Sequence, residues 1–435
     1  MNRFDFFIVG GGAAGICAAL GARARLRGEG VPDSAFRIAI AERNDRLGIK
    51  IRISGGGKCN VTHAGDMRQV LSEGFLRASE QRFLKPAFFA LSNETVLSWL
   101  RAKGVETYAR ENGRVFPRSG KASDVLAAFE AMLNESAVEV LLNAHVQDVR
   151  RDSSGFVLES SRGEFRADFL LIATGGVSYP KTGTTGDGLR FARKLGHSII
   201  EPIAALAPIR FRQKPLSHLV GVSLRNVGLI AESERHKFFR RDDVLITHWG
   251  VSGPACLSIS REVAEELRHA SVRIFADLFP DETTETLDKT FVAFQTKRAA
   301  QFVRTFFEER LPNAIVPSLF EQADLALEQK WSVLPKSSRK RLVEASKKFF
   351  LGEAQEVPIE RGEVSAGGVS LKEIDPKTMR SRLVEGLHFA GEALDVAGEV
   401  GGFNLQAAYS TGWLAGESVA KTFLAKLSRR CENLN

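Results

Sequence analysis

The feature that most constrains this chain is a glycine pattern placed directly after its first apolar run. Residues 4–9 (FDFFIV) are aromatic and β-branched, as in a buried strand. They lead into GGGAAG at residues 10–15, which has the spacing G-x-G-x-x-G, and small residues with helical periodicity follow. A second strand-like run at residues 36–41 ends at Glu42. This strand–turn–helix–strand order is the context in which the pattern binds a dinucleotide, whereas a glycine turn alone occurs in many α/β proteins.

Each position of the motif has a physical role. Gly10 permits the tight turn, Gly12 lets the backbone approach a pyrophosphate, and Gly15 lets the helix pack closely on the strand. The free N–H groups of the helix start would face the phosphates. Glu42 would accept hydrogen bonds from the adenosine ribose, and a long loop at residues 27–33 explains its extra distance from the motif.

A second glycine segment, KIRISGGGKCN at residues 50–60, favours FAD over NAD. Its three consecutive glycines would expose backbone N–H groups to a ligand. It is not a phosphate-binding loop of the Walker type, because Arg52 stands where that motif has its first glycine. We expect this segment to lie along the cofactor; a mobile surface loop is the alternative.

A third segment, FLLIATGG at residues 169–176, is typical of a buried strand that ends in a turn. Residues 138–149 before it are predicted to form one strand, with the backbone of Val146 available to the adenine. The turn TGTTGDG follows, and then a short helix at residues 189–195. Asp187 in this turn would cap the helix or contact the flavin, and the sequence leaves both roles open.

A fourth segment, GLHFAGE at residues 386–392, is again strand-like and ends in a turn. GGFN at residues 401–404 then precedes a long helix predicted from about residue 405 to about residue 424. In a flavoenzyme the start of such a helix stabilises negative charge at the N1–C2=O edge of the reduced flavin. Packing of a C-terminal helix on the core is the plainer alternative.

These segments together resemble the HI0933-like flavoproteins, a family that includes enzymes named aminoacetone oxidase. The matching motifs are ISGGGKCNVTH, ATGGVSYPKTGTTGDG, THWGVSGPA and AGGVSLKEIDPKTMRSRLVEGLHFAGEALDVAGEVGGFNLQAAYSTG. The resemblance extends to about residue 420, and it departs only slightly, with Lys58 where arginine is common and His63 where asparagine is common. It implies an α/β fold in which a Rossmann-like FAD-binding domain, of the type with two dinucleotide-binding domains, is interrupted by an insert with a β-rich and a helical part.

The resemblance also implies which residues contact a non-covalently or otherwise tightly bound FAD. Asp187 is added to them from its place in the TGDG turn. The expected cofactor contacts are Gly10, Gly12, Ala14, Gly15, Glu42, Arg43, Lys50, Ser54, Gly55, Gly57, Asn60, Val146, Thr174, Gly175, Asp187, Gly391, Glu392, Gly402, Asn404 and Leu405.

Three domains are predicted along the chain. Residues 1–202 and 358–435 would form the FAD-binding domain, residues 203–281 and 350–357 a β-rich insert, and residues 282–349 a helical insert whose phenylalanines form its core. The most basic run lies at residues 336–348. We interpret it as a solvated helix face rather than a nucleic-acid site, because no aromatic side chains alternate with its charges.

Candidate catalytic residues are fewer than the candidate cofactor contacts. His248, in the turn THWGVSGP, could exchange a proton with a substrate, although a histidine bonded within its own turn is equally compatible with the pattern. Cys59 is the second candidate, with a buried inert thiol as the alternative. The histidines show no metal-ligand spacing, so no metal site is predicted.

The sequence therefore predicts an FAD-dependent oxidoreductase that acts on a small organic substrate. NAD(P)H is a candidate transient reductant, since no second dinucleotide motif is present. The TGDG turn is similar to that of fumarate-reductase-type flavoproteins, which favours alkene reduction. The alternatives are an aminoacetone-like amine oxidase that uses O2, a flavin-bearing RNA-modifying protein and a non-catalytic flavin-binding protein.

Composition places limits on the partners. Four scattered cysteines, no apolar run long enough for a membrane span and no recognisable signal peptide favour a cytoplasmic protein without disulfides or membrane contact. The net charge of +8 is compatible with anionic ligands, but nucleic acid is not the expected partner. The oligomeric state is left open.

Overall fold

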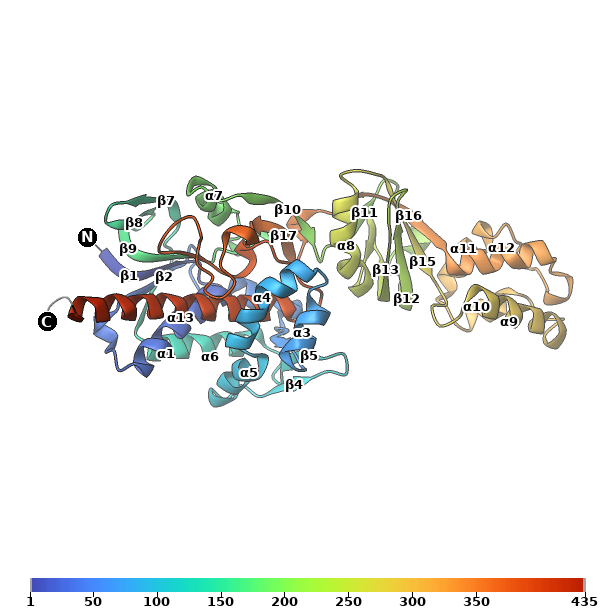
Figure 1. The fold of residues 1–435 in the computed structure, drawn as a ribbon. Helices are drawn as coiled ribbons and strands as arrows, with labels where there is room; N and C mark the ends of the chain where they lie inside the picture. Colours follow the sequence, from blue (N-terminus) through green and yellow to red (C-terminus); the bar gives the residue numbers. More distant parts are fainter. Residues whose placement is uncertain (1, 433–435) are drawn as a thin grey trace. The chain divides into compact units, whose positions relative to one another are not determined.

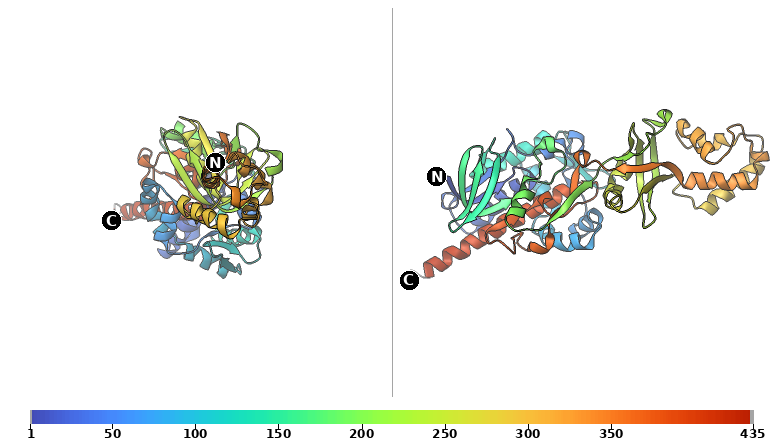
Figure 2. Two further views of the ribbon diagram at one scale, coloured as in Figure 1. Left: turned by 90° about the vertical axis from the view of Figure 1, so that its right-hand side faces the viewer. Right: turned by 90° about the horizontal axis from the view of Figure 1, so that it is seen from above.

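The chain folds into two compact units in the computed structural model, which describes residues 2–432. The Rossmann unit comprises Met1–Pro202 and Glu363–Asn435, and the barrel unit comprises Ile203–Gly362. Each unit has its own hydrophobic cluster. The barrel unit can be followed in the ribbon by its colours, which run from yellow-green to orange (Figures 1 and 2). The further division of the insert into a β-rich and a helical domain stays a prediction.

A seven-stranded sheet forms the centre of the Rossmann unit, with the order β6-β2-β1-β9-β8-β7 and with β18 also paired to β9. Strand β1 is parallel to both neighbours, so that Ile8 lies opposite Ile40 on one side and Leu171 on the other. Its residues are buried on both faces, which explains the continuous apolar run. The strands are β1 (Asn2–Val9), β2 (Ile38–Ala41), β6 (Val138–Leu141), β7 (Val146–Asp152), β8 (Gly155–Ser160), β9 (Gly163–Ile172) and β18 (Leu387–Phe389).

Helices and two small sheets complete the Rossmann unit. The helices are α1 (Ala13–Gly28), α2 (Ile49–Ile53), α3 (Met67–Gly74), α4 (Ala78–Ala90), α5 (Asn93–Ala102), α6 (Ala122–Glu135), α7 (Asp187–Lys194) and α13 (Phe403–Glu432). The remaining strands are β3 (Thr62–His63), β4 (Thr107–Ala109) and β5 (Arg114–Pro117), which pair together, and β10 (Ile199–Ala205), which pairs with β17 (Val364–Val369).

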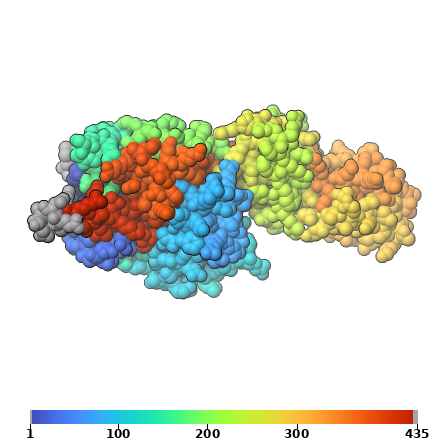
Figure 3. Space-filling model, viewed as in Figure 1, coloured from blue at the N-terminus to red at the C-terminus, as the bar shows by residue number. Residues whose placement is uncertain are grey.

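The first and last helices of the Rossmann unit are packed backbone to backbone. A side chain at Gly412 would overlap the carbonyl oxygen of Ala14, and one at Gly416 would overlap that of Ala18. Only residues without a Cβ allow two helices to approach this closely, which explains the small residues along α13. The two segments of the unit also meet where the backbone N–H of Glu399 donates to the carbonyl of Gly74 at 2.8 Å. Figure 3 shows orange-red atoms of the C-terminal segment lying against blue atoms of the N-terminal segment.

The barrel unit is built on a closed barrel with the order β11-β14-β13-β12-β15-β16. Its hydrophobic cluster continues into the helices, where Phe291, Phe306 and Phe307 are buried as predicted. The barrel strands are β11 (Ile209–Phe211), β12 (Ser223–Glu232), β13 (Lys237–Ile246), β14 (Gly250–Ser252), β15 (Val272–Asp277) and β16 (Phe349–Glu356); the helices are α8 (Pro254–Glu266), α9 (Thr284–Lys297), α10 (Arg304–Glu308), α11 (Val316–Gln322) and α12 (Lys336–Lys347).

Two predictions about local structure are wrong. Residues 138–149 form two strands, β6 and β7, because the chain between them turns to bond the end of β2: Asn143 donates to the carbonyl of Asn44 at 2.9 Å and Ala144 to that of Glu42 at 2.8 Å. The basic run at residues 336–348 is only partly a solvated face, since Arg339 is 8% exposed and its guanidinium lies 2.8 Å from Asp288.

No helix in the described part of the chain is long and apolar enough to cross a membrane.

The contact between α1 and α13 predicts a large effect of one methyl group. Gly416→Ala should lower the free energy of unfolding by about 1–3 kcal/mol, because the new Cβ meets backbone atoms that cannot rotate away. Urea unfolding measures the change. Gly28→Ala is the matched control, since a Cβ there meets no atom within 4 Å, and it should be neutral or slightly stabilising. Equal stability of the two variants would contradict the packing argument.

Candidate functional site

The glycine turn after β1 is shaped by backbone contacts. Gly10 has φ +111°, and a Cβ there would overlap the carbonyl oxygen of Ala173 on the neighbouring strand. A Cβ at Gly15 would overlap the carbonyl oxygen of Gly10, so both positions require glycine. The roles predicted for these two glycines from the sequence therefore have a direct steric basis.

Gly12 differs from its neighbours because it faces open space. A Cβ built on Gly12 meets no atom within 4 Å. Gly12 is also the N-cap of α1, which has no side-chain cap and no acidic residue in its first turn. The first turn of α1, where Ala14 lies, therefore carries no carboxylate of its own, and a bound anion would find both room and N–H donors there. These features fit the pyrophosphate of FAD.

Glu42 lies directly beside this turn, at the end of β2. Its carboxylate is 8% exposed and accepts hydrogen bonds from the backbone N–H of Gly11 at 2.8 Å and from that of Asn44 at 2.9 Å. The side-chain amide of Asn44 also donates to this carboxylate at 2.6 Å, so three of about four acceptor positions are used and one remains for a ribose hydroxyl. The structure thus brings Glu42 to the motif despite the long intervening loop, and the ribose contact stays a prediction.

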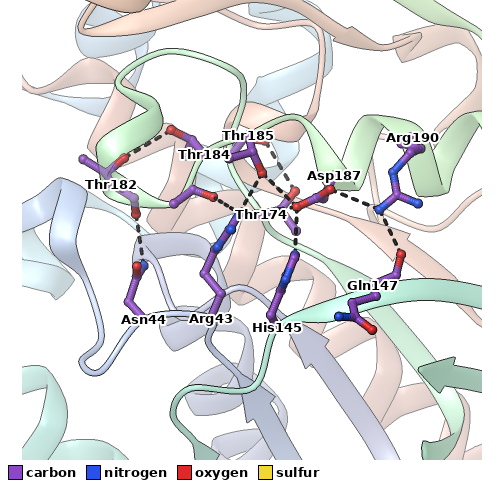
Figure 4. A network of polar contacts seen from close by, with 12 residues as sticks. Arg43, Asn44, His145, Gln147, Thr174, Thr182, Thr184, Thr185, Asp187 and Arg190 are labelled. Carbon is purple, nitrogen blue, oxygen red and sulfur yellow. Dashed lines mark hydrogen bonds and ion pairs between the residues drawn. The ribbon is translucent and has the colours of Figure 1, made fainter. Parts of the chain in front are cut away.

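A polar network joins the 182–188 turn to the ends of β2 and β7 (Figure 4). One carboxylate oxygen of Asp187 lies 2.8 Å from the Thr185 hydroxyl, 3.2 Å from His145 and 3.4 Å from Arg43. The other accepts from Arg190 at 3.1 Å. Burial raises the pKa of Asp187, but the hydrogen bonds from Thr185, Arg190 and His145 outweigh it, and the pKa lies below its ordinary value. Asp187 is therefore an anion that organises this turn.

The capping role considered for Asp187 is wrong. The N-cap of α7 is Gly186, in the left-handed conformation, and no side chain caps the helix. The helix begins at Asp187 itself, two residues before the predicted start. The carboxylate instead points toward Arg43 and His145 (Figure 4).

A second polar cluster unites residues that are more than 300 positions apart. The Lys50 ammonium lies 2.5 Å from the Glu392 carboxylate and 2.9 Å from the Ser178 hydroxyl. The other Glu392 oxygen accepts from the backbone N–H and the hydroxyl of Ser365, at 2.9 and 3.0 Å. Lys50 and Glu392 were both predicted as cofactor contacts, whereas Ser178 and Ser365 were missed; Ser178 lies inside a quoted family motif, and Ser365 directly precedes one.

The triple glycine segment forms a short 3-10 turn after α2. Gly55, Gly56 and Gly57 all have positive φ, between +57° and +84°. A Cβ at Gly56 or Gly57 would meet nothing within 4 Å, so this backbone faces open space. The Ser54 hydroxyl is used locally and donates to the carbonyl of Ile51 at 2.8 Å. A ligand could approach this backbone closely, as expected, although the contact itself stays a prediction.

The turn before α13 is held by side-chain amides. Asn404 accepts from the backbone N–H of Gly398 at 2.8 Å and donates to its carbonyl at 2.9 Å. Asn60, with its amide oxygen toward Gly402, accepts from that backbone N–H at 3.0 Å. The N–H of Gly391 is also occupied, by the Thr411 hydroxyl at 2.9 Å. These residues thus hold the turn together, and their contact with the cofactor stays a prediction.

The other predicted contacts lie in the turn after β9, at the start of β7 and in the first turn of α13. Thr174 and Gly175 follow β9, and a Cβ at Gly188 would overlap the Thr174 hydroxyl, so α7 packs directly on this turn. Val146 is buried at the start of β7, and Leu405 lies half-buried in the first turn of α13. Every predicted cofactor contact therefore lies in the Rossmann unit.

The two catalytic candidates have opposite environments. Cys59 is 0% exposed, and burial raises the pKa of its thiol to about 12, so it is neither an accessible nor an ionised nucleophile. His248 is exposed in the turn between β13 and β14, and its ring makes no hydrogen bond to another residue within the described chain, unlike the turn-bonded alternative. Catalysis by either residue stays a prediction.

Glu42 provides a test of the adenosine end of the site. Glu42→Gln should weaken FAD binding about tenfold, because hydrogen bonds to a charged group contribute about 1.5–3 kcal/mol. Titration of the FAD-free protein, followed by flavin fluorescence, measures the affinity. Glu139→Gln on the neighbouring strand is the matched control, since Glu139 is an exposed partner of Arg37. Unchanged affinity of Glu42→Gln would exclude the proposed ribose contact.

Cys59 provides a test of the alternative catalytic candidate. Cys59→Ala should retain flavin reduction and turnover within about twofold, because a neutral buried thiol contributes no nucleophile. In the native protein Cys59 should resist alkylation by iodoacetamide at pH 8, and it should react after unfolding in urea. Fast alkylation of native Cys59, together with lost turnover in the variant, would instead support a catalytic thiol.

Comparison with known proteins agrees with this geometry. The family described as the HI0933-like protein Rossmann domain matches residues 4–418. The chain is 29% identical to a 3-dehydro-bile acid delta(4,6)-reductase of Clostridium scindens, over 97% of this chain and all of that protein. It is 30% identical to a ribosomal RNA dihydrouridine synthase of Haemophilus influenzae, over 95% of this chain and 98% of that protein.

A solved structure also shares the fold. The 3-ketosteroid delta1-dehydrogenase of Sterolibacterium denitrificans superposes with a TM-score of 0.52, at 12% identity, over 97% of this chain and all of that one. The expected Rossmann-type FAD-binding architecture with an insert is confirmed by this likeness and by the family match.

Proposed function

We propose that this chain, which belongs to the HI0933-like family and is an FAD-dependent oxidoreductase, reduces a carbon–carbon double bond conjugated to a carbonyl group. The observation that carries the proposal is the chemistry shared by two relatives that match nearly the whole chain. A delta(4,6)-reductase of a 3-dehydro steroid saturates double bonds in line with a 3-oxo group. Dihydrouridine is uridine whose C5=C6 bond, conjugated to the C4 carbonyl, has been saturated.

The proposed reaction balances with a reduced nicotinamide as the electron source. NAD(P)H and one proton are consumed, the double bond gains two hydrogens, and NAD(P)⁺ is released. Bound FAD supplies the hydride chemistry of this exchange. The hydride adds to the carbon remote from the carbonyl, and a proton adds to the carbon beside it, because the carbonyl stabilises the intermediate negative charge.

The chain's own residues have three roles in this proposal. The first turn of α1 beside Gly12 holds the pyrophosphate, and Glu42 holds the adenosine ribose. The half-buried cluster of Lys50, Glu392 and Ser178 keeps a charged pair in fixed geometry at the flavin end. His248 is the proposed source of the proton, because its imidazole is exposed and not engaged by another described side chain.

A ribosomal RNA substrate is the second candidate beside a small enone. The relative named as a ribosomal RNA dihydrouridine synthase is 30% identical, and the net charge of +8 would attract a polyanion. Small-molecule and RNA substrates share the same bond chemistry, so the reaction can be tested separately from the substrate.

Anaerobic mixing experiments test the reaction. NADH or NADPH should bleach the FAD-loaded protein near about 450 nm, and a conjugated enone steroid or a uridine-containing ribosomal RNA should restore the colour without O2. The product should gain two hydrogens by mass spectrometry. Buffer and a saturated steroid are the controls. Bleaching by an amine rather than by either nicotinamide, with colour restored only by O2, would overturn the proposal in favour of an amine oxidase.

A further inference from the structure

The barrel unit carries an exposed tryptophan on a firmly held turn. Trp249, between β13 and β14, is 48% exposed. The Trp249 carbonyl accepts a hydrogen bond from the backbone N–H of Phe211 at 2.8 Å. The carbonyl of the next residue, Gly250, accepts one from the backbone N–H of Thr247, also at 2.8 Å. The ring is thus presented by ordered backbone instead of a loose loop. Tryptophan exposed in this way is typical of a binding surface, because its apolar faces are costly to leave in water.

Cations surround this ring. The Lys214 ammonium lies 4.3 Å from the ring centroid and the Arg210 guanidinium carbon lies 5.7 Å from it. Arg210 is paired with Glu356, whereas Lys214 has no carboxylate within ion-pair distance among the described residues. One uncompensated positive charge therefore lies at an exposed aromatic side chain.

The basic run on α12 offers no comparable surface. Arg339 is buried against Asp288, Lys347 lies 2.7 Å from Asp277 and Lys348 lies 2.6 Å from Glu232. These three charges are balanced within the barrel unit and would add little to binding of a polyanion, and the exposed Lys336 and Lys340 have no aromatic residue with them in the run at residues 336–348. The ion-pair partners of this run lie far away in the sequence, so the sequence alone shows the positive charges without the carboxylates that balance them.

We propose that Trp249 is a stacking platform for an unpaired base of an RNA strand and that Lys214 contacts the adjoining phosphate. This inference rests on the RNA branch of the proposed function. Single-stranded nucleic acid is bound by aromatic rings that stack on bases together with cations that follow the backbone, and both elements meet here within 4.3 Å. An acidic peptide would use the cation but would not need the exposed ring face.

Binding of labelled RNA tests the platform. The full-length FAD-loaded protein is titrated with a fluorescein-labelled uridine-rich oligonucleotide, followed by anisotropy at several salt concentrations. Trp249→Ala should weaken binding about tenfold, within the range measured for loss of one stacked base, whereas Trp249→Phe should retain most of the affinity. Lys214→Ala should lower the slope of log affinity against log salt by about 0.7–1.

Phe239→Ala is the matched control. Phe239 is also 48% exposed and lies on β13 of the same barrel, but no cation lies over its ring within the described residues. The Phe239→Ala variant should bind RNA with the same affinity as the unaltered protein. Equal loss in Trp249→Ala and Phe239→Ala, or no loss in either, would overturn the platform.

Two further readouts separate this inference from the proposed function. Trp249→Ala should leave FAD affinity and the reduction of a free enone unchanged; a matching loss of either would make the ring part of the enzyme's internal packing and overturn the inference. Trp249-dependent RNA binding without any saturation of uridine would retain the platform and refute the RNA substrate. Saturation of a small enone without Trp249-dependent RNA binding would retain the reaction and refute the platform.

Discussion

The backbone-to-backbone contact between α1 and α13 is the constraint on which the Rossmann unit depends. It joins the first and last helices of the described chain, and therefore closes a unit whose two segments are separated by the whole insert. The same contact fixes the position of α13 along α1, because Gly412, nine residues after the start of α13, touches Ala14 in the first turn of α1. No charged side chain takes part in this contact between backbones.

Electrostatics then act within this steric frame. Asp187 is stabilised as an anion by Arg43, His145 and Arg190, and Glu392 is held by Lys50 and two serines. In both clusters an acidic group is matched by donors from other parts of the chain, which offset the cost of its partial burial. The clusters secure the loops that surround the glycine turn and leave Gly12 itself open.

Much of this arrangement could be predicted, because it follows from local patterns. Contacts with backbone determine the apolar run before Gly10, the spacing of the glycine motif and the glycines of α13. Such contacts restrict the residue types that fit at these positions, so the pattern can be recognised in the sequence. The break between β6 and β7 and the role of Asp187 could not be predicted in the same way. Both depend on partners such as Asn44 and His145 that are distant in sequence, and a short polar turn looks alike with or without them. The pairing of Arg339 with Asp288 was missed for the same reason.

The paired strands β10 and β17 connect the insert to the Rossmann unit, and this connection affects how the insert could change during evolution. The chain leaves the Rossmann unit along one of these strands and returns along the other, and no buried residue between positions 207 and 363 belongs to the first unit's hydrophobic cluster. Mutations inside the barrel core therefore leave the core around the glycine turn intact. A lineage could therefore remodel or exchange the whole insert while inheriting an unchanged FAD-binding Rossmann unit.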